Sequence, residues 1–523
     1  MSWFVRCLVF GMLAACGNSI SLELTERGQG SGSGEGSAEV AAGYSRPATP
    51  ADLPDGFPFA PPVGPDEVGG SGEATAPRSL CDDGIPAAWE PRCGAGLCVG
   101  CETDAACGAG LACRSGACLP ATLPEATLEL LPERAAQLFG APARLASFWA
   151  EMVRDGQSVR RFFAVRRETA TDTKLSFDVY RQQLSETGEA LPEGSGELVL
   201  DERWVGGFAD GSLLREALSQ QAIAVLTGQP MGSGEHWLVT VNGQTYGPMF
   251  IFREADDAAL LAAGRSADAP RFVADGSGEI FASGGGALVP LPAGRYAEAF
   301  VEESSSADDF APLASLVEGA VAVDAAAQAA GSGAGACAVR RVLDVNGYLD
   351  GLAALALLGD GGHARANYRL SLQPSAGSGR RWEVWYDNFG LSFGCLWNEA
   401  DNNALCGGMD ASLTAYSGVF EGDASAAAYP VTQYFNLLTD VVLRDPELER
   451  AFGARICDML DSAYWSEALP RQIAGLGALL EPSASVDPRD RLEGADGYRA
   501  ELDALLAYHA DRTRLLRSQF LCF

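Results

Sequence analysis

Beyond about residue 123, the chain has two parts that differ in the spacing of their hydrophobic residues. In the first part, short apolar runs alternate with polar residues, as in RRFFAVRR, KLSFDVYRQQL and HWLVTVNGQTYGPMFIF, and this alternation predicts β-strands. Asn242-Gly243 separates two apolar stretches and predicts a tight hairpin. In the second part, apolar residues recur at helical intervals in VNGYLDGLAALALLG, TQYFNLLTDVVLRDPELERAF and YRAELDALLAYHADRTRLLRSQF. We therefore predict an α+β domain over residues 120–523, with a β-rich N-lobe (about 120–285), a helical C-lobe (about 286–523) and a cleft between them.

The residues that precede this domain differ from it in composition. Residues 1–15 contain an early arginine and an apolar run too short to cross a bilayer, and they predict a signal peptide. The LAAC sequence that ends at Cys16 resembles the bacterial lipobox, which implies lipidation of Cys16, and Gly17 favours sorting to the outer membrane. We expect a lipoprotein of the bacterial cell envelope, exposed to the periplasm or the cell surface, with an unlipidated secreted protein as the alternative. Residues 16–80 are rich in Gly, Ser and Pro and predict a disordered tether.

Residues 81–119 are too few to build a core of their own and contain seven cysteines, which predicts a module held by disulfides. The cysteines are Cys81, Cys93, Cys98, Cys101, Cys107, Cys113 and Cys118. A zinc site that starts at Cys98-x-x-Cys101 is the alternative, but the later cysteines have other spacings and no histidine lies nearby. The spacing resembles the Dickkopf-N-like cysteine-rich repeats of bacterial lipoproteins.

Five further cysteines follow in the main domain. We predict that Cys395 pairs with Cys406 across a short polar loop, and that Cys457 pairs with Cys522 between two late helices. This leaves Cys337, so either one bridge joins it to the module, most simply at Cys81, or at least two thiols stay free.

The net charge is −32, with a pI of about 4.4. So acidic a surface repels phosphate backbones, which argues against nucleic-acid binding, and it does not favour docking to anionic lipid by charge. We expect membrane contact only through the N-terminal lipid, and an exported or envelope protein as the partner.

Five segments of the main domain, taken in order, resemble the CotH (spore coat protein H) kinase family. They are VRDGQSVRRFFAVRR with KLSFDVY, FADGSLLREALSQQ, VTVNGQTYGPMFIFREADDAAL, YLDGLAALALLGDGGHARANYRLSL and RRWEVWYDNFG. The resemblance extends over about residues 123–523 and implies a two-lobed fold of the atypical-kinase type. It also implies ATP and Mg²⁺ as cofactors and transfer of a phosphoryl group to an exported or envelope protein.

The resemblance assigns roles to five residues. Lys174, the only lysine in the chain, corresponds to the lysine that contacts nucleotide phosphates, with a chance survivor of codon usage on a solvated strand face as the alternative. Glu216 corresponds to the helix glutamate that pairs with this lysine, with an ordinary exposed glutamate as the alternative. Asp360 corresponds to the catalytic acid that orients the acceptor hydroxyl, with a helix-capping loop as the alternative. Asn367 and Asp387 correspond to ligands of Mg²⁺.

The sequence departs from the family pattern at two places. DNFG at Asp387 contains one acid where related chains show D-x-D, and RETA at residues 167–170 lacks the usual glycine and asparagine. Both differences fall on nucleotide or metal contacts. A pseudokinase, meaning a catalytically inactive lipoprotein that binds or organises surface partners, is therefore the competing interpretation.

Overall fold

The structure is a computed structural model. It describes residues 89, 100–107, 109–133, 146–154, 156–167, 175–181, 199–205, 210–255, 257–274, 288, 291, 295–303, 309–330, 334–359, 367–374, 379–387, 389, 392–398, 403–405, 436–484 and 494–522. The predicted signal peptide, the tether and Cys16 lie outside these ranges.

Seven strands form a closed barrel, with the order β3-β4-β5-β6-β7-β9-β8. The strands are β3 (Glu125–Glu129), β4 (Ala146–Arg154), β5 (Gln157–Arg167), β6 (Leu175–Arg181), β7 (Val199–Val205), β8 (Gly234–Val241) and β9 (Gln244–Phe252). All neighbours are antiparallel except β3 and β8, which close the barrel as a parallel pair. Phe163, Phe177 and Trp204 are fully buried in the barrel core, where their rings pack edge to face. The β-rich first part predicted from the sequence is confirmed.

The hairpin between β8 and β9 turns at the predicted Asn242-Gly243 pair. Both residues have positive φ, 47° and 77°, as a two-residue turn of the favoured hand requires. The Asn242 side chain also accepts a hydrogen bond from the Leu130 N–H (2.7 Å) and donates one to the Leu130 carbonyl (3.0 Å). The turn therefore also secures the end of β3.

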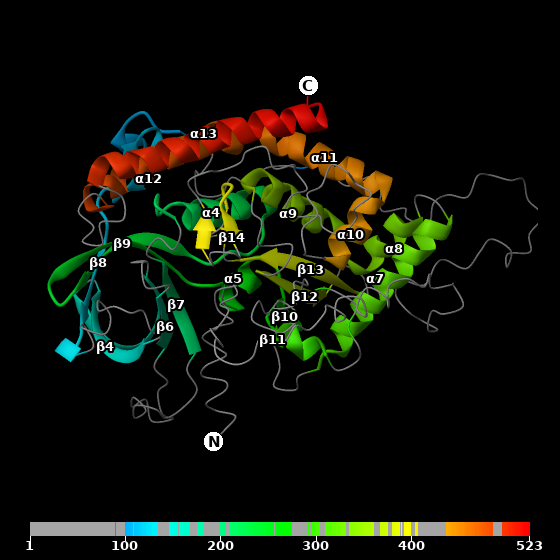
Figure 1. Cartoon of the computed structure of the whole chain (residues 1–523), viewed down its shortest axis with the longest axis horizontal. Helices are drawn as coiled ribbons and strands as arrows, with labels where there is room; N and C mark the ends of the chain where they lie inside the picture. The colour runs from blue at the N-terminus through cyan, green and yellow to red at the C-terminus, as the bar shows by residue number, and fades with distance from the viewer. Residues whose placement is uncertain are drawn as a thin grey trace, which may run out of the picture.

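A second sheet lies beside the barrel and belongs to the C-terminal body (Figure 1). It is antiparallel, with the order β11 (Phe300–Glu302), β10 (Arg271–Ala274), β12 (Tyr368–Pro374) and β13 (Arg380–Tyr386). β10 precedes the lobe boundary expected near residue 285, yet it pairs with β11 and β12. A short ribbon, β14 (Leu396–Asn398) with β15 (Asn403–Leu405), follows this sheet in the chain.

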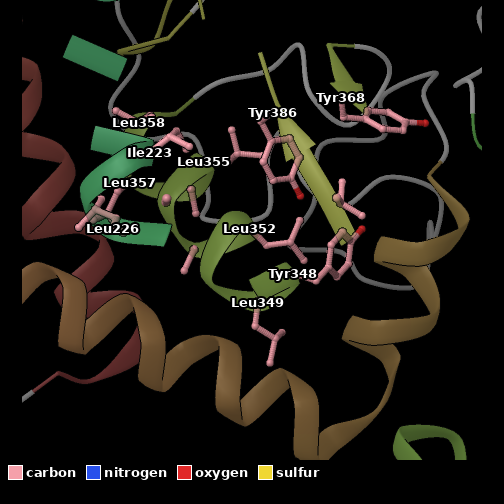
Figure 2. Packing of buried hydrophobic residues seen from close by; sticks show 14 of the residues in the cluster. Ile223, Leu226, Tyr348, Leu349, Leu352, Leu355, Leu357, Leu358, Tyr368 and Tyr386 are labelled. Carbon is pink, nitrogen blue, oxygen red and sulfur yellow. The ribbon is translucent and has the colours of Figure 1, made fainter. Parts of the chain in front are cut away.

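Helices surround the central helix α9 (Val345–Leu358), which packs against α4, α11, α13 and β13. The other helices are α4 (Arg215–Thr227), α5 (Asp257–Ala262), α7 (Ala311–Ala330), α8 (Ala334–Val342), α10 (Leu437–Arg444), α11 (Pro446–Asp461), α12 (Leu469–Ala484) and α13 (Gly494–Phe520), with short η4 (Asp104–Ala106), η5 (Tyr296–Glu298) and η6 (Tyr464–Ala468). Figure 2 shows α9 side chains between Ile223 and Leu226 of α4 and Tyr386 of β13. The core of the C-terminal body thus joins helices to the second sheet.

The apolar pattern at residues 432–452 gives two helices rather than a continuous one. Pro446 is the first residue of α11, where its missing N–H costs nothing. The Asp445 side chain caps α11 by accepting hydrogen bonds from the N–H groups of Glu447 (2.9 Å) and Leu448 (3.3 Å). None of the helices in the described ranges combines the length and apolar composition that crossing a bilayer requires.

The cysteine-rich module contains the hairpin β1 (Leu111–Arg114) and β2 (Ala117–Pro120), which packs on α12. Disulfides join Cys101 to Cys113 and Cys107 to Cys118. These bonds confirm a disulfide module, and they take Cys101 out of the alternative zinc site. Of the described residues, the sulfurs of Cys101, Cys107 and Cys118 gather closely enough for a metal, but all three are in these disulfides.

The module rests on α12 through close packing at small residues. The Arg471 side chain lies against Gly100 and Gly116, and Gly475 of α12 leaves room for the carbonyl of Arg114. The Trp89 indole N–H donates to the Leu226 carbonyl at the end of α4 (2.8 Å). The module is therefore packed against the C-terminal body and is not an independent domain.

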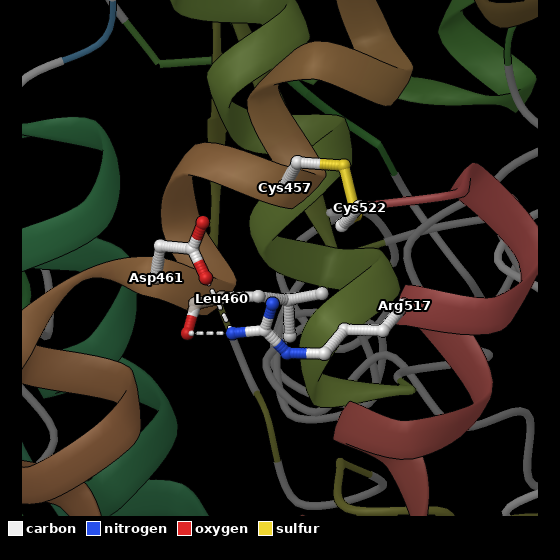
Figure 3. The surroundings of a disulfide bond; sticks show 5 residues. All are labelled: Cys457, Leu460, Asp461, Arg517 and Cys522. Carbon is white, nitrogen blue, oxygen red and sulfur yellow. Dashed lines mark hydrogen bonds and ion pairs between the residues drawn. A yellow bond between two sulfur atoms is a disulfide. The ribbon is translucent and has the colours of Figure 1, made fainter.

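A disulfide joins Cys457 of α11 to Cys522, the pair that the sequence analysis proposed (Figure 3). Cys395 is also in a disulfide. Strand register pairs Leu396 with Leu405, the sequence neighbours of Cys395 and Cys406, but Cys406 itself lies outside the described residues. The pairing of Cys81 with Cys337 likewise stays a prediction, because Cys81 and the Cys337 side chain are not described.

Candidate functional site

A cavity of about 630 Å³ lies between the barrel and the second sheet. This volume is within the range of pockets that enclose small ligands. Its wall consists of Gln220, Pro230, Met231, Gly232, Phe252, Arg253, Glu254, Ala255, Leu260, Arg271, Val301, Glu302, Glu303, Arg369, Trp385, Tyr386 and Asp387. The wall of this cavity is rich in acids and arginines.

The predicted metal ligands Asn367 and Asp387 lie side by side at one end of the second sheet. Strand register pairs Tyr368 with Tyr386, and the Asp387 N–H donates to the Asn367 carbonyl (3.0 Å). The Asp387 side chain is 25% exposed and faces the cavity, whereas Asn367 is buried and does not line it. The sheet thus presents the Asp387 carboxylate, but not the Asn367 amide, to a ligand.

Arg369 of β12 is the central cation of this wall. Its guanidinium donates from Nε to Asp387 (2.9 Å), from Nη1 to Glu303 (3.3 Å) and from Nη2 to Glu254. Burial alone would lower the pKa of Arg369, but the three carboxylates raise it, so the guanidinium stays charged. One side chain therefore joins the ends of three strands: β9 of the barrel, and β11 and β13 of the second sheet.

Glu254 couples this cation to the barrel. Its carboxylate also forms an ion pair with Nη2 of Arg203 on β7 (2.8 Å). Desolvation would raise the pKa of Glu254, but Arg203 and Arg369 outweigh it and lower the pKa to about 2. Glu254 is thus a carboxylate at neutral pH and links the two lobes at the cavity.

The segment after α4 forms another wall of the cavity. The Gln229 side chain donates to the Val384 carbonyl (3.0 Å) and accepts from the Tyr386 N–H (3.1 Å), so it bonds to the backbone of β13 as a neighbouring strand would. At Gly232, an added Cβ would lie 1.5 Å from the Arg253 carbonyl oxygen. The chain before β8 therefore passes close to the chain after β9 because residue 232 has no side chain.

The other predicted site residues lie away from the described cavity wall or outside the described ranges. Lys174 and Asp360 both fall outside the described residues. Glu216 is buried and accepts a hydrogen bond from the amide of Gln220 (2.8 Å), which itself lines the cavity. The alternative of an exposed helix glutamate at position 216 is therefore wrong, while its pairing with Lys174 stays a prediction.

The family-like DGSLLRE segment makes a structural cluster at the start of α4. The Asp210 carboxylate accepts from the Ser212 N–H (3.0 Å) and the Arg215 N–H (2.8 Å), and it pairs with the Arg215 guanidinium (2.5 Å). Arg215 is fully buried and also lies 3.8 Å from Glu501 of α13. These residues fasten α4 and do not line the cavity.

The cavity wall has the chemistry of a cation site. Mg²⁺ takes hard oxygen ligands and is usually held by one or two carboxylates together with substrate phosphates. Asp387 offers such a carboxylate, and its surroundings already accommodate a positive group, the Arg369 guanidinium. The described residues therefore fit a divalent cation with Asp387 as its protein ligand, provided that Arg369 releases the Asp387 carboxylate.

Sequence reasoning missed Arg369, Arg203 and Glu303. The available signal was the alternation in NYRLSL: Tyr368 and Leu370 are buried in the core, so Arg369 between them must face the other way. No local pattern could reveal which acids it meets, because these come from strands far apart in the chain.

The fold defines an α+β protein with a cavity between a β-barrel and a body of helices and sheet. The family model described as CotH kinase protein matches residues 156–516, well over half of the chain. The chain belongs to the CotH kinase family. The strands β3 and β4, which complete the barrel, and the cysteine-rich module precede the matched range. No curated protein matches the chain.

Proposed function

We propose that this chain is an exported phosphotransferase that binds ATP in the inter-lobe cavity and phosphorylates a protein of the cell envelope. The observation that carries the proposal is the position of Asp387, a carboxylate at the end of β13 that faces a cavity of about 630 Å³. Membership of the CotH kinase family implies ATP and Mg²⁺ as the candidate ligands.

The residues of the cavity wall have separable tasks in this proposal. Asp387 holds the metal ion, which when bound neutralises phosphate charge. Gln220 supplies an amide from α4, and Glu216 orients that amide from one helical turn away. The Gln229 bonds to β13 and the close packing of Gly232 on Arg253 fix the segment between α4 and β8 in the cavity wall. Lys174 and Asp360 keep the roles that the resemblance assigns to them: phosphate contact and orientation of the acceptor hydroxyl.

Export and lipidation belong to the same proposal. Disulfides persist in oxidising compartments and are rare in a reducing cytosol. The bonds Cys101–Cys113, Cys107–Cys118 and Cys457–Cys522 support an extracytoplasmic location. Replacing Cys16 with Ser should move the protein from the membrane fraction to the soluble fraction. Full membrane retention of this variant would contradict lipidation.

A non-catalytic binder is the second candidate, and one observation favours it. The Asp387 carboxylate is held by Arg369, and the sequence offers a single acid where related chains have two. In that case the cavity serves recognition, and no phosphoryl group is transferred.

Phosphorylation separates the two candidates. The purified chain is incubated with γ-labelled ATP, Mg²⁺ and an envelope protein fraction, beside Asp387→Asn as the matched variant. Transfer of label by the wild type and its loss in Asp387→Asn supports the phosphotransferase. ATP binding without transfer supports the binder, and the absence of ATP binding contradicts a nucleotide site.

A further inference from the structure

We infer that Arg369 and a divalent cation exclude each other at Asp387, so that the nucleotide-free protein does not bind metal there. This inference rests on the proposed function for the identity of the nucleotide, but not for the exclusion itself. It makes Arg369 a positioning residue that controls when Asp387 can act as a ligand.

The geometry of Arg369 carries the first step. Each of its three nitrogens donates to a different carboxylate, and its Nε–H is directed at Asp387 Oδ2 at 2.9 Å. The side chain is only 15% exposed, so few other positions are open to it. A metal ion on the same carboxylate would lie beside a guanidinium, and two like charges at such a distance repel strongly inside a protein.

The charge balance carries the second step. Glu254 is shared between Arg203 and Arg369, and Glu303 and Asp387 both meet Arg369. The carboxylates therefore already have cationic partners. A metal ion without nucleotide would gain little electrostatic attraction from them, and it would lose part of its hydration shell. An acidic cleft of this kind does not attract Mg²⁺ as an uncompensated cluster would.

Phosphates change this balance. A nucleotide brings oxygen ligands for the metal and at the same time acceptors for a guanidinium, which binds phosphate well through its planar fork of donors. Arg369 can then exchange Asp387 for a phosphate oxygen while it keeps Glu254 and Glu303. The order of binding follows: metal enters this site with the nucleotide and not before it.

Metal binding tests the inference without any measurement of activity. Mn²⁺ serves as the probe, and its free concentration is followed by electron paramagnetic resonance with and without a non-hydrolysable ATP analogue. Without nucleotide, we expect no saturable binding by the wild type up to about 1 mM, and binding at least about tenfold tighter in Arg369→Gln. The added Asp387→Asn change should abolish the gain. Arg253→Gln is the matched control, because Arg253 lines the same cavity but pairs with Glu202.

Two outcomes overturn the inference. Nucleotide-free binding of Mn²⁺ by the wild type that is lost in Asp387→Asn shows that Arg369 does not exclude the metal. A folded Arg369→Gln protein that binds Mn²⁺ no more tightly than the wild type also shows that Arg369 does not exclude the metal. If that variant does not fold, Arg369→Met replaces it, since methionine fills similar space without charge, and the same tighter binding of Mn²⁺ is expected. A wild type that binds no nucleotide, while Arg369→Gln gains metal, contradicts the proposed function and leaves the exclusion standing.

Discussion

Arg512 of α13 donates two hydrogen bonds to the carbonyl oxygen of Ala356, from Nε at 2.9 Å and from Nη2 at 2.6 Å. Arg512 is fully buried, and burial lowers its pKa. Ala356 belongs to the last turn of α9, where carbonyl groups lack partners within the helix and carry partial negative charge. A buried arginine thus caps the central helix of the C-terminal body.

Replacing Arg512 with Met should destabilise the protein because the buried Ala356 carbonyl loses both guanidinium bonds and keeps only the longer bond from the Gly359 N–H (3.3 Å). We expect the free energy of unfolding to fall by about 1–3 kcal/mol, measured by urea denaturation. Arg514→Met is the control, since Arg514 is 77% exposed and pairs with Asp511 on the surface. Its effect should stay within about 0.5 kcal/mol. Equal effects of the two changes would show that Arg512 does not act as a cap.

The disulfide between α11 and Cys522 should contribute more to stability than the ion pair beside it. Cys457 and Cys522 are 65 residues apart in sequence, and the chain-entropy model gives about 4 kcal/mol for such a loop. Arg517 pairs with Asp461 one turn away, and such exposed pairs contribute about 0–1 kcal/mol (Figure 3). Urea denaturation of Cys457→Ala/Cys522→Ala and of Asp461→Asn measures both. A larger loss of unfolding free energy in Asp461→Asn than in the double cysteine variant would contradict this prediction.

Acid should destabilise the protein in two pH ranges. His236 and His509 are buried, and desolvation lowers their pKa below the usual 6.5, although each ring bonds to a backbone carbonyl. The unfolded chain therefore takes up protons near pH 6.5 that the folded chain does not, and stability falls as the pH drops below that value. Glu254 contributes in a lower pH range. Its pKa is about 2 in the folded chain and 4.5 in the unfolded chain, so the stability that it provides above pH 4.5 is lost as the pH falls toward 2.

Urea midpoints at pH 8, 6.5 and 5 check the histidine range. The double variant His236→Gln/His509→Gln should show a flatter dependence between pH 8 and 5 than the wild type. The same slope in both proteins would assign the effect to other groups; His363 lies outside the described residues.

Gly232→Ala should damage the cavity because the new Cβ would lie 1.5 Å from the backbone oxygen of Arg253, which cannot move aside as a side chain could. We expect a lower melting temperature and a loss of ligand affinity at the inter-lobe cavity, measured by thermal unfolding and by titration with an ATP analogue. Gly379→Ala is the control, because an added Cβ there meets nothing within 4 Å. Wild-type behaviour of Gly232→Ala would show that the segment between α4 and β8 adjusts freely.

Local signals in the sequence predicted the elements that depend on neighbouring residues. The Asn242-Gly243 hairpin and the helices α9 and α13 follow from turn chemistry and apolar spacing. The closure of the barrel does not, because β3 pairs in parallel with β8 and the two strands are far apart in the chain. The second sheet escaped prediction for the same reason: β10 joins β12 across α7, α8 and α9.

The site divides in the same way. Asp387 was found because a motif marks it, and the structure places it on the cavity wall next to Asn367. Its partner Arg369 was not found, since an arginine in a strand has no distinctive pattern. The contact depends on the register of β12 and β13, which brings residue 369 to the end of the strand that carries Asp387.

The docking of the cysteine-rich module on α12 has a consequence for biosynthesis. The two disulfides described there join cysteines 12 and 11 residues apart, so they can close as soon as this segment reaches an oxidising compartment. Arg471, which rests on Gly116, is translated hundreds of residues later. The module can therefore be oxidised before it docks on α12, and chains that stop before α12 leave its docking surface open to quality-control proteases.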